Sequence, residues 1–338
     1  MGGRLIQHDR GKTLGGSSSI NGMVFIRGHA RDFDMWRQMG CEGWSYSDVL
    51  PYFKRMENYS GGGDDFRGAN GPLNVKRPDA DALHPLSSAF LNAGEQAGYL
   101  VTDDISGHKQ EGFGVLDRTT HNGERWSTAK AYLEPVKSRR NLRIETGVQV
   151  QRVLFNGTRA TGVEIRRKSG QIAQVTADRE VILSAGAVST PHILMLSGIG
   201  PADHLHPLGI EPLADREGVG ANLNEHPDFL LKFHLTEPIS LYPQTKGLRQ
   251  LAAGAQWLLT RDGICASNHF ETVACIRSNA GVDYPDIQLT MVPLAMEAHG
   301  WDAMPNTCFP NTRWTYARPQ PWAHNAAGQK RHHRQRYS

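Results

Sequence analysis

The spacing of hydrophobic residues changes from region to region along the chain. Residues 31–53 and 83–98 have apolar side chains three or four positions apart, which predicts amphipathic helices. Residues 142–167 instead alternate apolar and polar side chains on either side of an Asn156-Gly157 turn. A period of two around such a dipeptide predicts a β-hairpin.

A third pattern begins with the continuous apolar run at residues 181–183. Small residues follow at 184–187, and an apolar helix is predicted over residues 191–196. A buried strand, a tight turn and a helix form the unit at which open α/β sheets bind their ligands. The remaining segments, up to about residue 304, alternate between predicted helix and strand. The sequence therefore predicts an α/β fold with α+β character.

The composition is that of a globular protein, with 39% hydrophobic and 21% charged residues. Four cysteines without a CxxC pair predict neither a disulfide framework nor a structural zinc site, and they indicate a reducing compartment. No apolar run approaches the ~20 residues that cross a bilayer. Six Lys or Arg and no Asp or Glu lie in residues 303–338, so the rest of the chain is slightly acidic and nucleic-acid binding is not expected.

Residues 11–28, GKTLGGSSSINGMVFIRG, join a pliable glycine and serine segment to the apolar run at residues 23–26. Glycine allows backbone N–H groups to approach a ligand closely, and small residues at a strand-to-helix turn leave room for a flat ring or a pyrophosphate. This segment and residues 184–187 are each also explained as a plain tight turn. Because neither contains GxGxxG, these residues do not by themselves identify a ligand.

The same residues resemble a known family. Residues 11–28 resemble the first signature of the glucose–methanol–choline (GMC) oxidoreductases, and GAVSTPHILMLSGIG, at residues 186–200, resembles the second. QEGFGVLDRTTHNGERWSTAKAYL, GVGANLNEHPD and ASNHFETVACIRS follow the family's running pattern, the last two in the manner of its choline dehydrogenase branch. The resemblance covers about residues 4–298. It implies a partial FAD-binding Rossmann-like domain and an antiparallel-sheet substrate domain, truncated at both ends.

The resemblance also implies roles for single residues. FAD would be bound non-covalently, since Ile20 stands where some relatives have a histidine that attaches the flavin. The ribityl chain and phosphates of FAD would lie along Gly15, Gly16 and Ser17, and its isoalloxazine would face Asn21, Gly22, Met23 and Val24. Val150 would contact the adenine, and Ala185 and Gly186 would lie beside the adenosine. Asp228 would face the quaternary ammonium group of choline, or else only pair locally in solvent. Two remote segments would then meet around one dinucleotide.

The expected organisation has five parts. Residues 1–30 cover the FAD, 31–135 are a helical and loop insertion with elements of the FAD domain, 136–225 complete that domain, and 226–305 form part of the substrate domain. Residues 306–338 are expected to be a disordered tail or a frameshift product, because a neighbouring reading frame can encode a family-like continuation. The family's GxGxxG unit and catalytic histidine segment are not found, so no catalytic residue is assigned and these residues alone are expected to be inactive.

Three functions follow from these expectations. The leading interpretation is an FAD-dependent alcohol or choline dehydrogenase, in which hydride passes from an alcohol CH–OH to flavin to give the aldehyde, and the electrons pass to a quinone or another acceptor. Choline and longer primary alcohols both stay open as substrates. A hydroxynitrile lyase on the same fold, and an inactive flavin-fold fragment with a basic tail, are the alternatives. The expected location is the cytoplasm, with membrane association left open.

Overall fold

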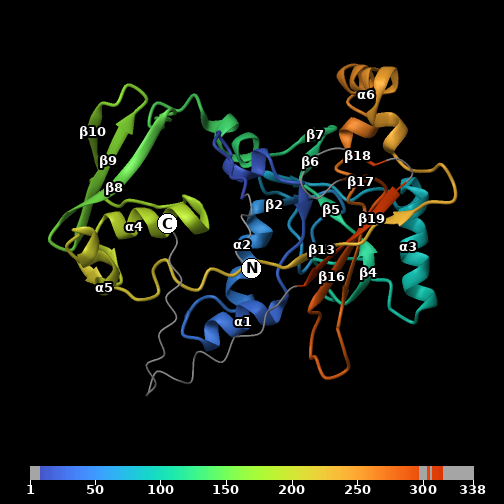
Figure 1. Cartoon of the computed structure of the whole chain (residues 1–338), viewed down its shortest axis with the longest axis horizontal. Coiled ribbons are helices and arrows are strands. Elements are labelled where there is room, and N and C mark those ends of the chain that lie inside the picture. Colours follow the sequence, from blue (N-terminus) through green and yellow to red (C-terminus); the bar gives the residue numbers. More distant parts are fainter. Residues whose placement is uncertain (1–7, 297–302, 305–306, 315–338) are drawn as a thin grey trace. The chain divides into compact units, whose positions relative to one another are not determined.

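The structure is a computed structural model that describes residues 8–296, 303–304 and 307–314 (Figure 1). These residues form two units. Unit 1 comprises the described residues up to Lys137 and from His226 onward, and unit 2 is Ser138–Glu225. The sequence predicts a part with nearly the same bounds as unit 2, residues 136–225.

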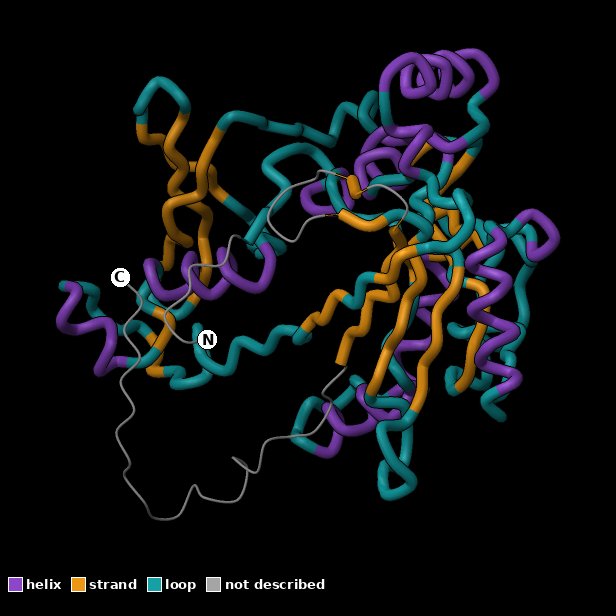
Figure 2. Tube along the Cα trace, turned by 45° about the vertical axis from the view of Figure 1, so that its right-hand side comes forward, coloured by secondary structure: helices purple, strands orange, loops and turns teal. Residues whose placement is uncertain are grey.

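An antiparallel sheet of six strands is the largest element of unit 1, and Figure 2 shows its strands side by side. The strand order is β13-β19-β16-β15-β4, and β14 also pairs with β19. The strands are β4 (Gly112–Val115), β13 (Asp228–Leu230), β14 (Phe233–His234), β15 (Thr272–Ile276), β16 (Ile287–Val292) and β19 (Thr307–Trp314). Strand β15 has neighbours on both edges, and helix α3 (Pro85–Gln96) packs against it, so four of its five residues are buried. The predicted mixed fold with an antiparallel sheet is confirmed.

The structure describes the first part of the expected tail. Residues 307–314 form strand β19, which pairs with β16 from Ile287↔Trp314 to Val292↔Phe309. An antiparallel ladder joins main-chain groups, so a segment without a clear side-chain period can still add to an open strand edge. These eight residues are therefore part of the sheet. Residues 315–338 lie outside the described part of the chain, and a disordered tail or a frameshift product stays a prediction for them.

The predicted helices of unit 1 are present. They are α1 (Ala30–Gln38), α2 (Tyr46–Met56), α3 and α6 (Gly247–Thr260). Helix α2 begins at a capping box in which Ser45 Oγ accepts from Asp48 N at 3.3 Å and the Asp48 carboxylate accepts from Ser45 N at 3.0 Å. Helix α3 begins with Pro85 at its first position, where the missing N–H has no cost.

Short strands complete unit 1. They are β1 (Val24–Phe25) with β5 (Asp117–Arg118), β2 (Glu57–Tyr59) with β3 (Leu73–Val75), β6 (Thr120–His121) with β7 (Glu124–Arg125), and β17 (Ala295–Met296) with β18 (Ala303–Met304). Strand β1 lies between two apolar clusters. Phe25 belongs to the cluster with Leu73, whereas Val24 and Ile26 pack against the cluster with Val273. Successive side chains of a strand point to opposite faces, so this short strand is fixed from both sides.

Unit 2 contains the predicted hairpin. Its elements are β8 (Val148–Asn156), β9 (Arg159–Arg167) and β10 (Ile172–Thr176) in one antiparallel sheet, α4 (Gly186–Leu196), α5 (Ala202–Leu205), and the parallel pair β11 (Ile199–Gly200) and β12 (Ala214–Asp215). Ser197 Oγ accepts from Val153 N at 2.8 Å and so ties the end of α4 to β8. The hairpin prediction is confirmed.

The predicted strand at residues 181–183 is not formed. Ile182 is 76% exposed, and helix α4 begins at Gly186, five residues before the predicted start. A continuous apolar run becomes a buried strand only where neighbouring strands flank it. Among the described residues of unit 2, no strand pairs with this run.

Candidate functional site

The glycine-rich segment folds back on itself. Gly15 adopts φ 85° and precedes a single 3-10 turn, Gly16–Ser19. A Cβ atom on Gly15 would lie 2.5 Å from Ser19 Oγ, and one on Gly11 would lie 2.2 Å from the carbonyl carbon of Gly16. The backbone contact excludes a side chain at Gly11, and at Gly15 a side chain would have to displace Ser19 Oγ and adopt a left-handed backbone. The local path of the chain therefore requires these glycines before any ligand is considered.

Arg125, at the end of β7, and Thr128, three residues later, hold this turn in place. Ser18 Oγ donates to Gly15 O at 2.5 Å and accepts from Thr128 N at 2.9 Å. Arg125 Nη1 donates to Ser18 O at 3.2 Å and to Asn21 Oδ1 at 2.8 Å. Two segments more than a hundred residues apart are thereby joined into one structure.

The backbone at Met23 is strained. Met23 has φ 59°, a left-handed conformation that costs a residue with a side chain roughly 1–2 kcal/mol. Its N–H donates to Asn21 Oδ1 at 3.1 Å, and its carbonyl accepts from Thr119 N at 2.8 Å. Such strain persists only where the surroundings fix it, and it is concentrated at functional sites. The N–H of Met23 is already used inside the protein.

The backbone N–H of Val24 is oriented so that a ligand could accept its hydrogen bond. It lies opposite Arg118 in the β1–β5 ladder. The N–H and C=O of Arg118 bond instead to Lys76, at 2.9 and 2.8 Å, so Val24 and Arg118 form a pair without mutual hydrogen bonds. The N–H of Val24 therefore points away from β5, toward the side of β1 on which no other strand of the described residues pairs.

A loop before β15 contacts the same segment. Asn268 Nδ2 donates to Gly22 O at 2.8 Å, and Arg118 Nη1 donates to Ser267 Oγ at 2.6 Å. The Phe270 ring lies 3.6 Å from the position of a Cβ on Gly22 and packs against the second apolar cluster. The sheet and the glycine-rich segment are therefore linked directly.

Ionisable side chains gather beside this loop. His84 N donates to Glu271 Oε2 at 2.8 Å. Burial lowers the pKa of the Arg118 guanidinium, and the Glu271 charge partly offsets this effect. Burial also lowers the pKa of His84 and of His269. His84 Nδ1 accepts from Leu86 N, so its Nε2 carries the proton and donates to a backbone carbonyl at 2.9 Å. Both imidazoles are thus held neutral near neutral pH.

Sequence reasoning did not single out Arg118, Asn268 or Glu271. Asn268 and Glu271 lie in the stretch ASNHFETVACIRS, which resembled the choline dehydrogenase branch. The family resemblance was therefore the only signal in the sequence that pointed to these two residues. Their roles could not be predicted from local patterns, because their side chains contact residues far away in the sequence.

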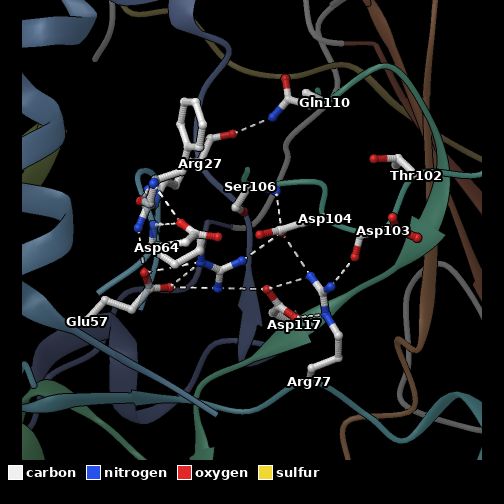
Figure 3. Close-up of polar contacts among 12 residues, drawn as sticks. Arg27, Glu57, Asp64, Arg77, Thr102, Asp103, Asp104, Ser106, Gln110 and Asp117 are labelled. Carbon is white, nitrogen blue, oxygen red and sulfur yellow. Dashed lines mark hydrogen bonds and ion pairs between the residues drawn. The ribbon is translucent and has the colours of Figure 1, made fainter. Parts of the chain in front are cut away.

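A buried ion-pair network lies beyond the other end of β1. Figure 3 shows carboxylates and guanidinium groups in alternation. Glu57, which is fully buried, pairs with Arg27 at 2.5 Å and with Arg67 at 2.7 Å, and Arg67 also pairs with Asp117 at 2.9 Å. The Arg67 guanidinium lies 3.7 Å from the Tyr59 ring centroid, and burial, followed by the Asp117 charge, raises the pKa of Tyr59 to about 12.

The network has a structural role. Arg77 and Asp104 complete it, with Arg77 Nε at 2.8 Å from Asp117 Oδ1 and Arg67 Nη1 at 2.7 Å from Asp104 Oδ1. Its charged groups are bonded to one another. Because Asp117 belongs to β5, the network anchors the ladder that positions Val24.

The predicted cofactor residues fall into two groups. The seven from Gly15 to Val24 lie together in unit 1, and Val150, Ala185 and Gly186 lie in unit 2. Val150 is half-buried in β8 opposite Ile165. Gly186 begins α4 with φ 88° and has open space where a Cβ would be. That the two groups meet around one cofactor stays a prediction.

Asp228 is exposed. It is the first residue of β13 and lies opposite Arg313 in the register with β19.

Among the described residues, no group of three or more His, Cys, Asp or Glu side chains is arranged to hold a metal ion. In the same residues, no helix combines the length and the hydropathy needed to cross a membrane.

Solved structures share this fold. A crystal structure of formate oxidase matches with a TM-score of 0.81 and 26% identity, covering 90% of this chain and 59% of that chain. Pyridoxine 4-oxidase from Mesorbium loti matches with a TM-score of 0.71 and 27% identity, covering 90% and 56%. The fold is therefore that of the flavoprotein oxidoreductases.

The chain belongs to the GMC oxidoreductase family, whose model matches residues 1–228. An oxygen-dependent choline dehydrogenase of Brucella suis biovar 1 is 51% identical over 301 residues, which are 89% of this chain and 54% of that protein. The protein of the same name from Rhizobium johnstonii is 51% identical over 300 residues, with the same coverage. The chain thus spans about half the length of these relatives.

Proposed function

We propose that the protein is an FAD-dependent oxidoreductase that oxidises choline, or a related cationic alcohol, to the aldehyde. Family membership and 51% identity to relatives named oxygen-dependent choline dehydrogenase support this function. The observation that carries it is the prepared backbone at Met23 and Val24. There a strained turn directs an N–H group toward the unpaired side of β1.

The cofactor would be held by the residues that the resemblance assigns. Gly15, Gly16 and Ser17 would lie along the ribityl chain and phosphates, and Val24 would direct its N–H at the isoalloxazine. When bound, FAD supplies the acceptor for the alcohol's hydride. A fixed N–H donor stabilises negative charge on the reduced ring without reorganisation. Asn21 has a supporting role, because its side chain holds Met23 N and Arg125.

Val150, Ala185 and Gly186 would contact the adenosine half. Attachment would be non-covalent at Ile20, because an aliphatic side chain cannot form the bond that a histidine forms. Mass spectrometry of acid-denatured protein tests this point, since FAD would separate from the polypeptide.

A carboxylate would attract the ammonium group of choline. Asp228 is the residue that the resemblance assigns. Glu271 is a second candidate, because it is half-buried and lies three residues after Asn268, whose side chain contacts Gly22. Glu271 already accepts from His84 N, so its second oxygen is the one left for a cation.

A comparison of a charged and a neutral alcohol distinguishes the two candidate carboxylates. We expect Asp228→Asn, or else Glu271→Gln, to raise the KM for choline about tenfold and to leave the KM for 3,3-dimethylbutan-1-ol unchanged. This neutral alcohol has the shape of choline without its charge, so only a true cation contact distinguishes the two substrates. Equal effects on both alcohols in both variants would refute a role for either carboxylate.

Anaerobic bleaching of the flavin tests the proposed function itself. The protein is purified with its flavin, and choline is added without any electron acceptor. Loss of the visible flavin absorbance is expected, whereas a lyase would leave the flavin oxidised. If residues 1–338 retain no flavin, the same assay is made on a chimera in which the Brucella suis relative supplies the segments outside the matched residues.

The electron acceptor and the fate of the isolated chain are separate proposals. Oxygen or a quinone would take the electrons, and reoxidation with each one in turn distinguishes them. FAD titration of residues 1–338 followed by fluorescence tests the expectation of weak uptake. Tight stoichiometric binding would contradict that expectation.

A further inference from the structure

Interactions around the end of the glycine-rich segment form a closed ring. Val24 lies opposite Arg118, and Arg118 Nη1 donates to Ser267 Oγ at 2.6 Å. The next residue, Asn268, donates from Nδ2 to Gly22 O at 2.8 Å. Gly22 and Val24 are two residues apart, so the chain itself closes the ring.

The Asn268–Gly22 hydrogen bond lies between two strained residues. Met23 directly follows Gly22 and has φ 59°, and His269 directly follows Asn268 and has φ 60°. Each left-handed conformation costs a residue with a side chain roughly 1–2 kcal/mol. Strained backbone is concentrated at functional sites, so two such residues beside one side-chain hydrogen bond indicate a functional constraint on both segments.

We propose that Asn268 is a positioning residue for the flavin. Its amide fixes the carbonyl of Gly22, and this carbonyl belongs to the peptide whose nitrogen is that of Met23. Fixing this peptide holds the left-handed turn at Met23 and so aims the N–H of Val24. The inference rests on the proposed function, because the N–H matters only if a flavin lies in front of it. The contacts of the Asn268 side chain that carry this inference are with Gly22 O and Phe270 N.

The expected effect is local. The Asn268–Gly22 hydrogen bond lies at the protein surface, and one such bond contributes about 0.5–1.5 kcal/mol. This energy is small beside the total stability of a folded domain, about 5–15 kcal/mol. Its loss should therefore loosen residues 22–25 without unfolding the protein.

Hydrogen exchange of the chain without flavin measures this loosening. Asn268→Asp keeps the shape and an acceptor for Phe270 N but replaces the donor with an oxygen, and Asn268→Ala removes both groups. The control is Asn279→Ala, which removes an asparagine that bonds to Gly281 N and Ser278 Oγ. We expect peptides containing residues 22–25 to exchange about two- to tenfold faster in both Asn268 variants, while the melting midpoint falls by only about 2–4 °C for each kcal/mol lost. Exchange equal to the unsubstituted protein, or equally fast in Asn279→Ala, would overturn the proposal.

A second measurement uses the flavin-loaded protein. In Asn268→Asp, the rate constant for flavin reduction at saturating alcohol should fall about two- to tenfold while the KM for the alcohol stays constant. A change in KM with an unchanged rate constant would instead place Asn268 at the substrate and contradict the inference. If alcohol does not reduce the flavin of the unsubstituted protein, the proposed function fails, and the exchange experiment still decides whether Asn268 positions residues 22–25.

Discussion

Substitution of one buried carboxylate should destabilise unit 1 strongly. Glu57 has a fully buried side chain and accepts hydrogen bonds from Arg27 Nη2 at 2.5 Å, from Arg67 Nη2 at 2.7 Å and from Gly68 N at 3.1 Å. Glu57→Gln keeps the shape of the side chain. It removes the negative charge and turns one acceptor into a donor that faces guanidinium donors. The three arginines of the network would then be balanced by two carboxylates.

The magnitude follows from burial. Removing one partner of a buried ion pair costs about 3–5 kcal/mol, because the other charge stays buried without compensation. An exposed pair contributes about 0–1 kcal/mol. Glu134 supplies the control, since it pairs with Lys137 at 2.5 Å and the two side chains are 57% and 63% exposed. Glu134→Gln is the same chemical change at the surface, so the difference between the variants isolates burial.

Urea unfolding followed by tryptophan fluorescence measures the difference. Unit 2 contains no tryptophan, and five of the seven tryptophans lie among the described residues of unit 1, so the signal follows unit 1 and not unit 2. We expect the free energy of unfolding to fall by about 3–5 kcal/mol in Glu57→Gln and by at most about 1 kcal/mol in Glu134→Gln. Losses within 1 kcal/mol of each other would refute the view that this network anchors the β1–β5 ladder.

Two further predictions concern the same unit. Gly15→Ala should destabilise by at least about 1–2 kcal/mol, because φ 85° is left-handed and the new Cβ would lie 2.5 Å from Ser19 Oγ; an unchanged thermal melt would contradict this. Burial lowers the pKa of the His269 imidazole from 6.5, so on acidification the unfolded chain takes up the proton first and stability falls below pH 6.5. His269→Asn, which tolerates the left-handed backbone, should reduce this fall, and an unaltered pH profile of urea midpoints would exclude the assignment.

Local sequence patterns were sufficient for the elements that neighbouring residues determine. The apolar spacing within residues 31–53 predicts the helices that form there, α2 among them, and alternation around Asn156-Gly157 predicts the hairpin. These signals succeed because capping and turn conformation depend on residues within a few positions. The antiparallel sheet and the family were also predicted correctly, the family from two long signatures.

Sequence patterns were insufficient where distant segments decide the structure. Residues 181–183 have the composition of a buried strand, but burial requires flanking strands that their own sequence cannot supply. Strand β19 forms on the edge of β16 in a segment without a hydrophobic period. The Asn268–Gly22 bond joins residues 246 positions apart, and no periodicity encodes such a contact. The candidate site depends on contacts of this last kind.

The glycine-rich segment and strand β1 have opposite mechanical requirements, and the structure meets both within ten residues. Gly15 and its neighbours need freedom to fold back on themselves. The strand needs a fixed direction, and it obtains one because Phe25 packs into one apolar cluster and Val24 into the other. A strand held on both faces cannot slip by one residue without moving apolar side chains to the wrong cluster. The register of Val24 in β1 is therefore set by the core, so the ligand does not need to impose it, and the Asn268 hydrogen bond fixes the Gly22–Met23 peptide that precedes the strand.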